Sequence, residues 1–155
     1  LGQGISLACG YAIAAKRFAK KKTPKVYCLM GDGEQNEGQV WEAAMFAGHN
    51  KLNNLCAIID INKIQIDGYT KDIMNAEPFE KKYQSFNWHT IRINGNNHKS
   101  IGGAFKKFLN YKGVKPTIIL ADTLAGKGLK SIEGLVSAHG QPITIDHLKE
   151  IKYKN

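Results

Sequence analysis

Two polar segments of the sequence each follow a short apolar run and carry oxygen atoms that suit a metal ion. The first is GDGEQNEG (31–38), directly after the apolar residues 26–30, and the second begins at Asn62, directly after residues 55–61. Asp32 supplies a carboxylate, and Asn62 supplies an amide oxygen. Hard oxygen ligands of this kind are typical of Mg²⁺ or Ca²⁺ sites. The two segments can form one site only if the fold brings them together.

The elements around these segments alternate between helix and strand. Apolar residues at three- and four-residue spacing predict helices, and short uninterrupted apolar runs predict buried strands. This alternation is typical of an α/β fold in which helices cover both faces of a parallel sheet. One domain over residues 1–155 is expected, with a long connection after the second strand and a glycine-rich functional loop at 125–142. The predicted helices are 4–20, 37–51, 99–112 and 145–154, and the predicted strands are 26–30, 55–61, 88–94 and 117–123.

A parallel sheet would place both polar segments at one edge. Ligands bind beyond the carboxyl ends of parallel strands, and the helix 37–51 would join the first two strands by a right-handed crossover. If those strands are neighbours, Asp32 and Asn62 face each other across a crevice. Gly31 and Gly33 allow the backbone to approach a bound group closely, and the nearby helix start favours a phosphate. A metal ion with a diphosphate is the predicted occupant.

A simpler interpretation stays open from these residues alone, in which Asp32 only caps a helix and Asn62 only forms a turn. Several better-known motifs are excluded. GDGEQN has Asn36 where the dinucleotide fingerprint needs its third glycine, and DINKIQIDG lacks the glycine and the glutamate of an EF-hand loop. AGKG (125–128) lacks the rest of a P-loop, and the chain contains no Gly-x-Ser-x-Gly nucleophile elbow.

The composition indicates a globular protein without a nucleic-acid or membrane partner. Hydrophobic residues make up 43% and charged residues 23% of the chain, as in ordinary globular domains, and no apolar run approaches the roughly 20 residues of a membrane span. The net charge of +9 comes from 20 Lys and only two Arg. Because Arg is the usual residue for bidentate phosphate and base contacts, the charge indicates a solvated surface that mildly attracts anions. Cys9, Cys28 and Cys56 lack metal-binding spacing and predict buried thiols in a reducing compartment such as the cytoplasm.

The motifs that survive these exclusions resemble the thiamine-diphosphate signature, in which GDG is followed some 25–30 residues later by Asn. More specifically, the chain resembles transketolase, above all the split form whose amino-terminal subunit carries this domain alone. The segments LGQG, GDGExxEGxxWEA, NKIQIDG, FNWHTIRINGNN and SAHGQP stand in the transketolase order and cover nearly the whole chain. The resemblance implies a diphosphate-binding domain of the thiamine-diphosphate fold and ketol transfer between sugar phosphates, as in the pentose phosphate pathway.

The resemblance also implies a role for individual residues. Asp32, the Asn62 side chain and the Ile64 backbone carbonyl would ligate Mg²⁺, with Ca²⁺ as an alternative metal. Gly31 and Gly33 would lie against the cofactor diphosphate. Ile66 would lie near the thiazolium, and Leu1, Gly2 and Gly4 would line the aminopyrimidine pocket. Glu37 would lie at the subunit contact, near the partner carboxylate that activates the cofactor. His139 would reach the diphosphate and the reaction centre.

Other polar residues of these motifs receive weaker assignments. Glu34, Gln35 and Asn36 are interpreted as spacers and helix-start polar groups. Lys127 is interpreted either as a contact to a sugar phosphate or as a solvated loop lysine. Trp41 and Trp88 are assigned to packing rather than to the cofactor.

Some features depart from the transketolase pattern. The chain starts inside the LGQG motif, so we expect it to be incomplete at its amino terminus, and we expect the activating glutamate to come from a separate pyrimidine-binding domain. Residues 95–97 read GNN where many relatives have Gly-His-Asp, which leaves the local sugar contacts undefined. We expect activity only with a carboxy-terminal transketolase subunit or domain, in a hetero- or homo-oligomer. Two alternatives stay open: another thiamine-diphosphate enzyme, such as a deoxyxylulose-phosphate synthase or a keto-acid decarboxylase, and a non-catalytic partner-binding remnant.

Overall fold

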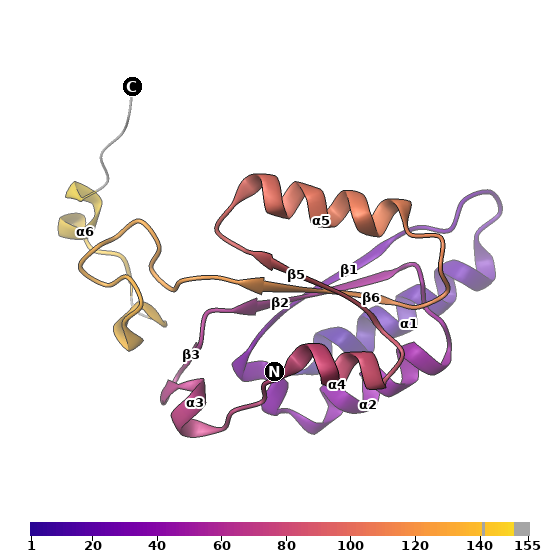
Figure 1. Cartoon of the computed structure of the whole chain (residues 1–155), viewed down its shortest axis with the longest axis horizontal. Coiled ribbons are helices and arrows are strands. Elements are labelled where there is room, and N and C mark those ends of the chain that lie inside the picture. The colour runs from indigo at the N-terminus through magenta and orange to yellow at the C-terminus, as the bar shows by residue number, and fades with distance from the viewer. Residues whose placement is uncertain (141, 151–155) are drawn as a thin grey trace.

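A four-stranded parallel sheet forms the centre of the molecule (Figure 1), as the α/β prediction requires. The computed structural model describes residues 1–140 and 142–150. The spatial order of the strands is β1-β2-β6-β5, so the first two strands are neighbours and β6 lies between β2 and β5. The strands are β1 (Val26–Gly31), β2 (Leu55–Ile61), β5 (His89–Asn94) and β6 (Thr117–Asp122).

Helices cover both faces of the sheet (Figure 1), which confirms the predicted layering. Three helices pack on one face and bury most of the core, and one amphipathic helix packs on the other. The first set is α1 (Gln3–Phe18), α2 (Gly38–His49) and α4 (Phe79–Ser85), and the opposite face carries α5 (His98–Asn110).

The larger core owes its close packing to small residues on α1 and α2. Ala12, Ala44 and Ala47 are completely buried there, and small side chains let helices approach a sheet closely. Trp88 fills the space beneath α2 and donates from its indole nitrogen to the Ala44 carbonyl over 2.9 Å. Trp41 packs its ring 5.4 Å from that of Tyr83. Both tryptophans therefore serve packing, as predicted.

The connection between β2 and β5 contains more structure than the sequence predicts. It forms a short antiparallel hairpin and two short helices, α3 and α4. Strands of two residues leave no readable alternation, and α4 buries only Phe79 and Tyr83, so neither gives a periodic signal. The hairpin strands are β3 (Ile64–Gln65) and β4 (Gly68–Tyr69), and α3 spans Thr70–Ile73.

The carboxy-terminal part follows the prediction less closely. The glycine-rich segment is a loop with one short 3₁₀ turn, η2 (Val136–Ala138), within its described residues. The helix predicted at 145–154 is present as α6 (Ile145–Lys149) but already ends at Lys149, with Glu150 as its C-cap. The rest of that prediction, 151–154, and Gln141 of the SAHGQP motif lie outside the described residues.

The three cysteines are buried and free, as predicted. Burial raises the pKa of the Cys9 thiol to about 11 and that of Cys56 to about 12, so both are neutral thiols near pH 7. In the part of the chain that the structure describes, no helix combines the length and the apolar character needed to cross a bilayer.

Candidate functional site

Asp32 joins the ends of the two neighbouring strands β1 and β2. Its backbone N–H donates to the Asp60 carbonyl over 3.1 Å. Its carboxylate accepts from the Gly33 N–H at 2.8 Å and from the Lys63 N–H at 2.6 Å. The Asp32 side chain therefore caps the 3₁₀ turn η1 (Gly33–Asn36) and also holds the residue that follows Asn62. The simpler interpretation of Asp32 as a cap is correct as far as it goes, but the carboxylate also spans two strand ends.

Asn62 lies directly beyond β2 with its carboxamide held on both sides. Its Oδ1 accepts from the Ile64 N–H over 2.9 Å, which is the turn that the simpler interpretation predicts. Its Nδ2 donates to a carboxylate oxygen of Asp60 over 3.1 Å. The next residue, Lys63, has a φ of 67°, and this left-handed conformation turns the chain back into the β3–β4 hairpin.

Glu34 has a structural role that the sequence analysis missed. Its carboxylate accepts from the Gly2 N–H at 2.8 Å and from the Gly31 N–H at 3.1 Å. It thereby ties the LGQG segment to the end of β1, so it is more than a spacer, and its position in the first turn of η1 confirms the interpretation as a helix-start polar group. Only the charge next to a glycine-rich turn hinted at this role, since one of the partners lies 32 positions away.

Gln35 is likewise not a spacer, because its side chain is only 1% exposed. Its Nε2 donates to the Gly31 carbonyl over 3.1 Å, and its Oε1 accepts from the Tyr83 hydroxyl over 2.8 Å. The Trp41 indole N–H donates to its backbone carbonyl over 2.9 Å. Gln35 thus anchors the GDG turn to Trp41 of α2 and to Tyr83 of α4.

One cavity of about 370 Å³ collects all the predicted site residues except Gly2 and Gly4. Its walls come from the β1 end, the β2 end, the tip of the hairpin and the loop before α6. The predicted residues that line it are Leu1, Gly31, Asp32, Gly33, Glu37, Asn62, Ile64, Ile66 and His139. The structure therefore brings together residues that are up to 138 positions apart in sequence (139 − 1 = 138).

Gly2 and Gly4 lie next to this cavity on the first turn of α1. Gly2 has a φ of 78°, and a Cβ there would approach the Glu37 Cβ to 2.8 Å, so the position requires glycine. Gly4 packs against β1, where a Cβ would lie 3.6 Å from the Cys28 sulfur. Gly2 is thus in contact with the cavity wall through Glu37, whereas Gly4 serves helix–sheet packing in this structure.

The exposed members of the set stand at the cavity rim. Ile66, at the tip of the hairpin, is 78% exposed although it is apolar. Glu37 is exposed and makes no side-chain cap to α2, and His139 is exposed at the end of η2. These three side chains are free to contact a ligand or a second polypeptide.

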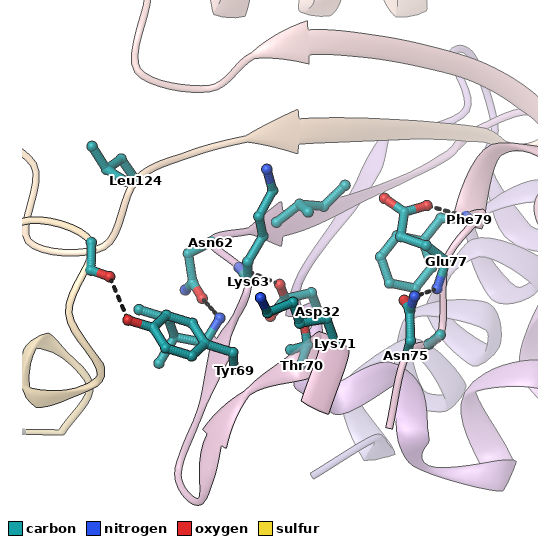
Figure 2. A pocket seen from close by; sticks show the side chains of 14 residues that line it. Asp32, Asn62, Lys63, Tyr69, Thr70, Lys71, Asn75, Glu77, Phe79 and Leu124 are labelled. Atoms are coloured by element: carbon teal, nitrogen blue, oxygen red, sulfur yellow. Dashed lines mark hydrogen bonds between the residues drawn. The ribbon is translucent and has the colours of Figure 1, made fainter. Parts of the chain in front are cut away.

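A second cavity of about 420 Å³ adjoins the first one at Asp32 and Asn62 (Figure 2). Asp32, Asn62 and Ile64 line both cavities. Tyr69 borders the second one, and its hydroxyl donates to the Gly134 carbonyl over 3.4 Å. Asp32 and Asn62 therefore occupy the partition between the two cavities.

The residues present fit a hard cation. Asp32 is 4% exposed, and burial is the main cause that raises the pKa of its carboxyl above the usual range. Among the described residues, no Lys, Arg or His nitrogen lies within 4 Å of it, so its charge lacks a side-chain counterion. Each of its oxygens accepts one backbone N–H and keeps a lone pair for another partner. Within residues 1–140 and 142–150, no three His, Cys, Asp or Glu side chains form a cluster that could hold a metal ion.

The backbone around Asp32 also fits a phosphate group. A Cβ at Gly33 would approach the Gln65 Cβ to 2.9 Å, whereas nothing lies within 4 Å of a Cβ at Gly31. Gly31 therefore leaves open space in which a diphosphate can lie close to the main chain, whereas at Gly33 the Gln65 side chain occupies the place of a Cβ.

The family model described as "Transketolase, thiamine diphosphate binding domain" matches residues 1–155. The chain belongs to the transketolase family. The resemblance drawn from the sequence motifs is thereby confirmed at the level of family and cofactor-binding domain.

Two curated transketolase relatives are described as subunits. The chain is 44% identical to a 6-deoxy-6-sulfo-D-fructose transketolase subunit of a Clostridium strain, over 93% of this chain and 51% of that protein. It is 39% identical to one subunit of the apulose-4-phosphate transketolase of Phocaeicola vulgatus, over 97% of this chain and 52% of that protein. The chain thus spans about half the length of these relatives.

Solved transketolases share the fold closely. The transketolase of Campylobacter jejuni superposes with a TM-score of 0.90 and 34% identity, over 98% of this chain and 24% of that one. A Pichia stipitis transketolase variant in complex with xylulose 5-phosphate gives a TM-score of 0.89 and 33% identity, with the same coverage. The fold class predicted from the alternating elements is therefore that of transketolases.

Proposed function

We propose that the chain is the thiamine-diphosphate- and Mg²⁺-binding component of a transketolase and transfers a two-carbon ketol unit between sugar phosphates. The observation that carries this proposal is the meeting of Asp32 and Asn62 at adjacent strand ends, in one cavity with Gly33, Ile66 and His139. The transketolase family match over residues 1–155 supports it, and it favours treating the chain as a single diphosphate-binding domain.

In this proposal the metal is held by the Asp32 carboxylate, the Asn62 Oδ1 and the Ile64 carbonyl. Mg²⁺ favours such oxygen ligands together with substrate or cofactor phosphates, and Ca²⁺ can use the same set. Gly31 and Gly33 leave room for the cofactor diphosphate beside the metal. The metal would neutralise both the diphosphate and the buried Asp32 carboxylate.

The rim residues take the remaining roles. Ile66 offers an apolar surface to the thiazolium ring, and Leu1, Gly2 and Gly4 belong to the segment beside the aminopyrimidine. Thiamine diphosphate, when bound, supplies the carbanion chemistry that breaks and forms the carbon–carbon bond. The role of His139 is to donate a hydrogen bond or a proton to an oxygen of the diphosphate or the sugar, for which its exposed position on the cavity wall suits it.

The proposal requires a partner. Glu37 is exposed at the rim and makes no cap contact within the chain, so it is available to a pyrimidine-binding subunit or domain in a homo- or hetero-oligomer. Two of its relatives are described as transketolase subunits, which supports an assembly from separate parts. Its net charge of +9 attracts anionic sugar phosphates. Three free buried thiols suit the reducing cytoplasm, where the pentose phosphate pathway operates.

A reconstitution experiment tests the proposal. The chain is purified, and ketol transfer from xylulose 5-phosphate to ribose 5-phosphate is followed with thiamine diphosphate and Mg²⁺, with and without the carboxy-terminal subunit encoded nearest to it. We expect no activity from the chain alone and activity from the pair that chelation of Mg²⁺ abolishes. Robust activity of the chain alone would contradict the partner requirement.

Measurement of cofactor binding distinguishes a catalytic subunit from a non-catalytic one. Calorimetry on the pair should show thiamine diphosphate binding that depends on Mg²⁺. Absence of binding to an assembled pair would contradict the proposal and favour a partner-binding remnant. Turnover of pyruvate in preference to pentose phosphates would favour a different thiamine-diphosphate enzyme.

A further inference from the structure

Asp60 carries no role in the arrangement described above, although its carboxylate touches the candidate metal site from behind. It is the sixth residue of β2, and its side chain projects to the sheet face that α5 covers. There it lines a mainly apolar cavity of about 240 Å³ with Leu29, Ile93 and Phe105. It lines neither of the two cavities that Asp32 borders. Asp60 is therefore placed behind Asn62 rather than beside the metal.

Each oxygen of the Asp60 carboxylate has one donor. Oδ2 accepts from Asn62 Nδ2 over 3.1 Å, and Oδ1 accepts a short hydrogen bond from the Thr123 hydroxyl. Thr123 follows β6 and is fixed in turn by its backbone N–H, which donates to the Ile61 carbonyl over 3.1 Å. Its methyl group packs where a side chain at Gly95 would collide with it. The carboxylate is thus held in one orientation by the neighbouring strand.

These contacts allow only one orientation of the Asn62 carboxamide. In the observed orientation Nδ2 faces the Asp60 acceptor and Oδ1 faces the Ile64 N–H donor. A rotation of the carboxamide by 180° would place Asn62 Oδ1 against the Asp60 carboxylate oxygen and the Asn62 NH₂ against the Ile64 N–H. Two hydrogen bonds would be replaced by two repulsive contacts, and leaving such groups unpaired is costly. The same orientation presents oxygen, the only metal-binding atom of the amide, on the hairpin side.

We propose that Asp60 is a positioning residue, which holds the Asn62 carboxamide with its oxygen directed to the metal site. The inference rests on the proposed function, because the orientation of the Asn62 carboxamide matters only if Asn62 binds the metal. Outer partners of metal ligands commonly orient them in this way, and their loss typically costs about 10- to 100-fold in metal affinity.

Substitutions at Asp60 separate positioning from charge. Asp60→Ala removes the acceptor, whereas Asp60→Asn keeps an acceptor for Asn62 if its own NH₂ faces Thr123, whose hydroxyl can accept instead of donate. Thr123→Val removes only the outer contact. We expect the Mg²⁺ concentration that half-saturates thiamine diphosphate binding, measured on the protein with its partner, to rise about 10- to 100-fold in Asp60→Ala. Asp60→Asn and Thr123→Val should stay within about threefold of the unsubstituted protein, as should Asp72→Asn, an exposed control on α3.

Equal losses in Asp60→Asn and Asp60→Ala would overturn the proposal, because the negative charge and not the acceptor would then matter. Unchanged Mg²⁺ dependence in Asp60→Ala would also overturn it.

A second measurement does not depend on cofactor binding. In the Mg²⁺-free chain labelled with ¹⁵N, the Asn62 side-chain NH₂ should give two resolved proton signals that exchange slowly with water. Asp60→Ala should speed this exchange at least about tenfold, because the protecting acceptor is gone. Unchanged exchange would overturn the positioning role. A third outcome separates the two proposals. If the unsubstituted protein binds no Mg²⁺, but its Asn62 NH₂ exchanges slowly and Asp60→Ala speeds this exchange, then the proposed function fails and the orientation of Asn62 by Asp60 stands.

Discussion

The candidate site is built from two parts, the metal loops and the His139 loop, which differ in how they are held in place. The metal loops, defined as residues 31–37 and 60–65, are fixed by contacts that their own side chains make with distant parts of the chain. Asp32 reaches the N–H of Lys63, Glu34 reaches that of Gly2, and Gln35 reaches the hydroxyl of Tyr83. Each contact crosses at least 31 positions of sequence. The metal loops are therefore part of the core architecture.

The His139 loop, defined as residues 124–140, is held mainly by itself. Lys127, interpreted either as a sugar-phosphate contact or as a solvated loop lysine, forms a local ion pair with Glu133 over 3.1 Å. Gly128 donates to the same carboxylate, and Gly134 donates to the Ala125 carbonyl. Its contacts to the rest of the chain include the Leu124 N–H to the Asn96 side chain and the hydroxyl of Tyr69 to Gly134.

From this difference we expect one half of the site, the metal loops, to be preformed, and the other half, the His139 loop, to change position when a ligand or a partner binds. A rigid metal half costs little to organise when the cation arrives. A loop with few distant contacts can close over a ligand or against a partner at low cost. Substitutions in the metal loops should therefore affect stability and binding together, whereas those in the His139 loop should affect catalysis alone.

The largest effect is expected from Asp32→Ala. It leaves the Gly33 and Lys63 N–H groups without their acceptor, which should lower the free energy of unfolding by about 3 kcal/mol. It also removes the only carboxylate of the proposed metal set, so Mg²⁺-dependent binding of thiamine diphosphate should weaken more than about 100-fold. Urea denaturation and calorimetry measure the two quantities. Exposed Asp72→Ala on α3 is the control, and a metal affinity no different from that control would exclude Asp32 as a ligand.

Glu34→Ala should come next. Losing the contacts to Gly2 and Gly31 should cost about 2 kcal/mol of unfolding free energy, less than Asp32 because Glu34 is only half-buried. Glu42→Ala, on the exposed face of α2, should change stability by less than about 0.5 kcal/mol. If both variants unfold at the same urea concentration, the tie between the LGQG segment and β1 does not contribute to stability.

Gly33→Ala should give a smaller loss. Its Cβ would meet the Gln65 Cβ at 2.9 Å, and pushing the hairpin aside should cost about 1 to 2 kcal/mol. Gly31→Ala is the matched variant, since a Cβ there meets nothing within 4 Å, and its thermal midpoint should be nearly unchanged. A Gly31→Ala protein that is the less stable of the two would refute this account of the cavity wall.

His139→Ala should have the smallest effect on the fold. The side chain is exposed, so the free energy of unfolding should change by less than about 0.5 kcal/mol. The Mg²⁺ dependence of cofactor binding should also stay unchanged, while kcat of the enzyme assembled with its partner should fall about 100-fold if His139 acts on a reacting oxygen. Exposed His49→Ala, at the end of α2, serves as the control. A normal kcat in His139→Ala would remove this residue from the proposed chemistry.

The sequence predicts the frame of the metal loops well because local signals determine it. The strand predicted at 55–61 matches β2 at both ends, and that at 26–30 misses only Gly31 of β1. Once parallel strands joined by one helix are accepted as neighbours, Asp32 and Asn62 must lie close together. The predicted meeting of the two residues followed from topology and needed no knowledge of side-chain packing.

The missed features depend on contacts between distant residues. Nothing near Gln35 in the sequence shows that Tyr83 will donate to it, and nothing near Asp60 shows that Thr123 will arrive from another strand. The β3–β4 hairpin has strands of two residues, which are too short to produce a pattern. Its position under Gly33 and Asn36 follows from the fold alone.

The order of the strands also has a consequence for how the site forms during folding. β1, α2 and β2 span residues 26–61 without interruption, so the contacts that unite Asp32 with the β2 end require closure of only a short stretch of chain. Such contacts form early because their entropic cost is small. The hydrogen bond from Thr123 to Asp60 must wait for β6, 63 residues further along the chain (123 − 60 = 63). We therefore expect the metal loops to form in the first βαβ unit and to become fully ordered only when β6 pairs with β2.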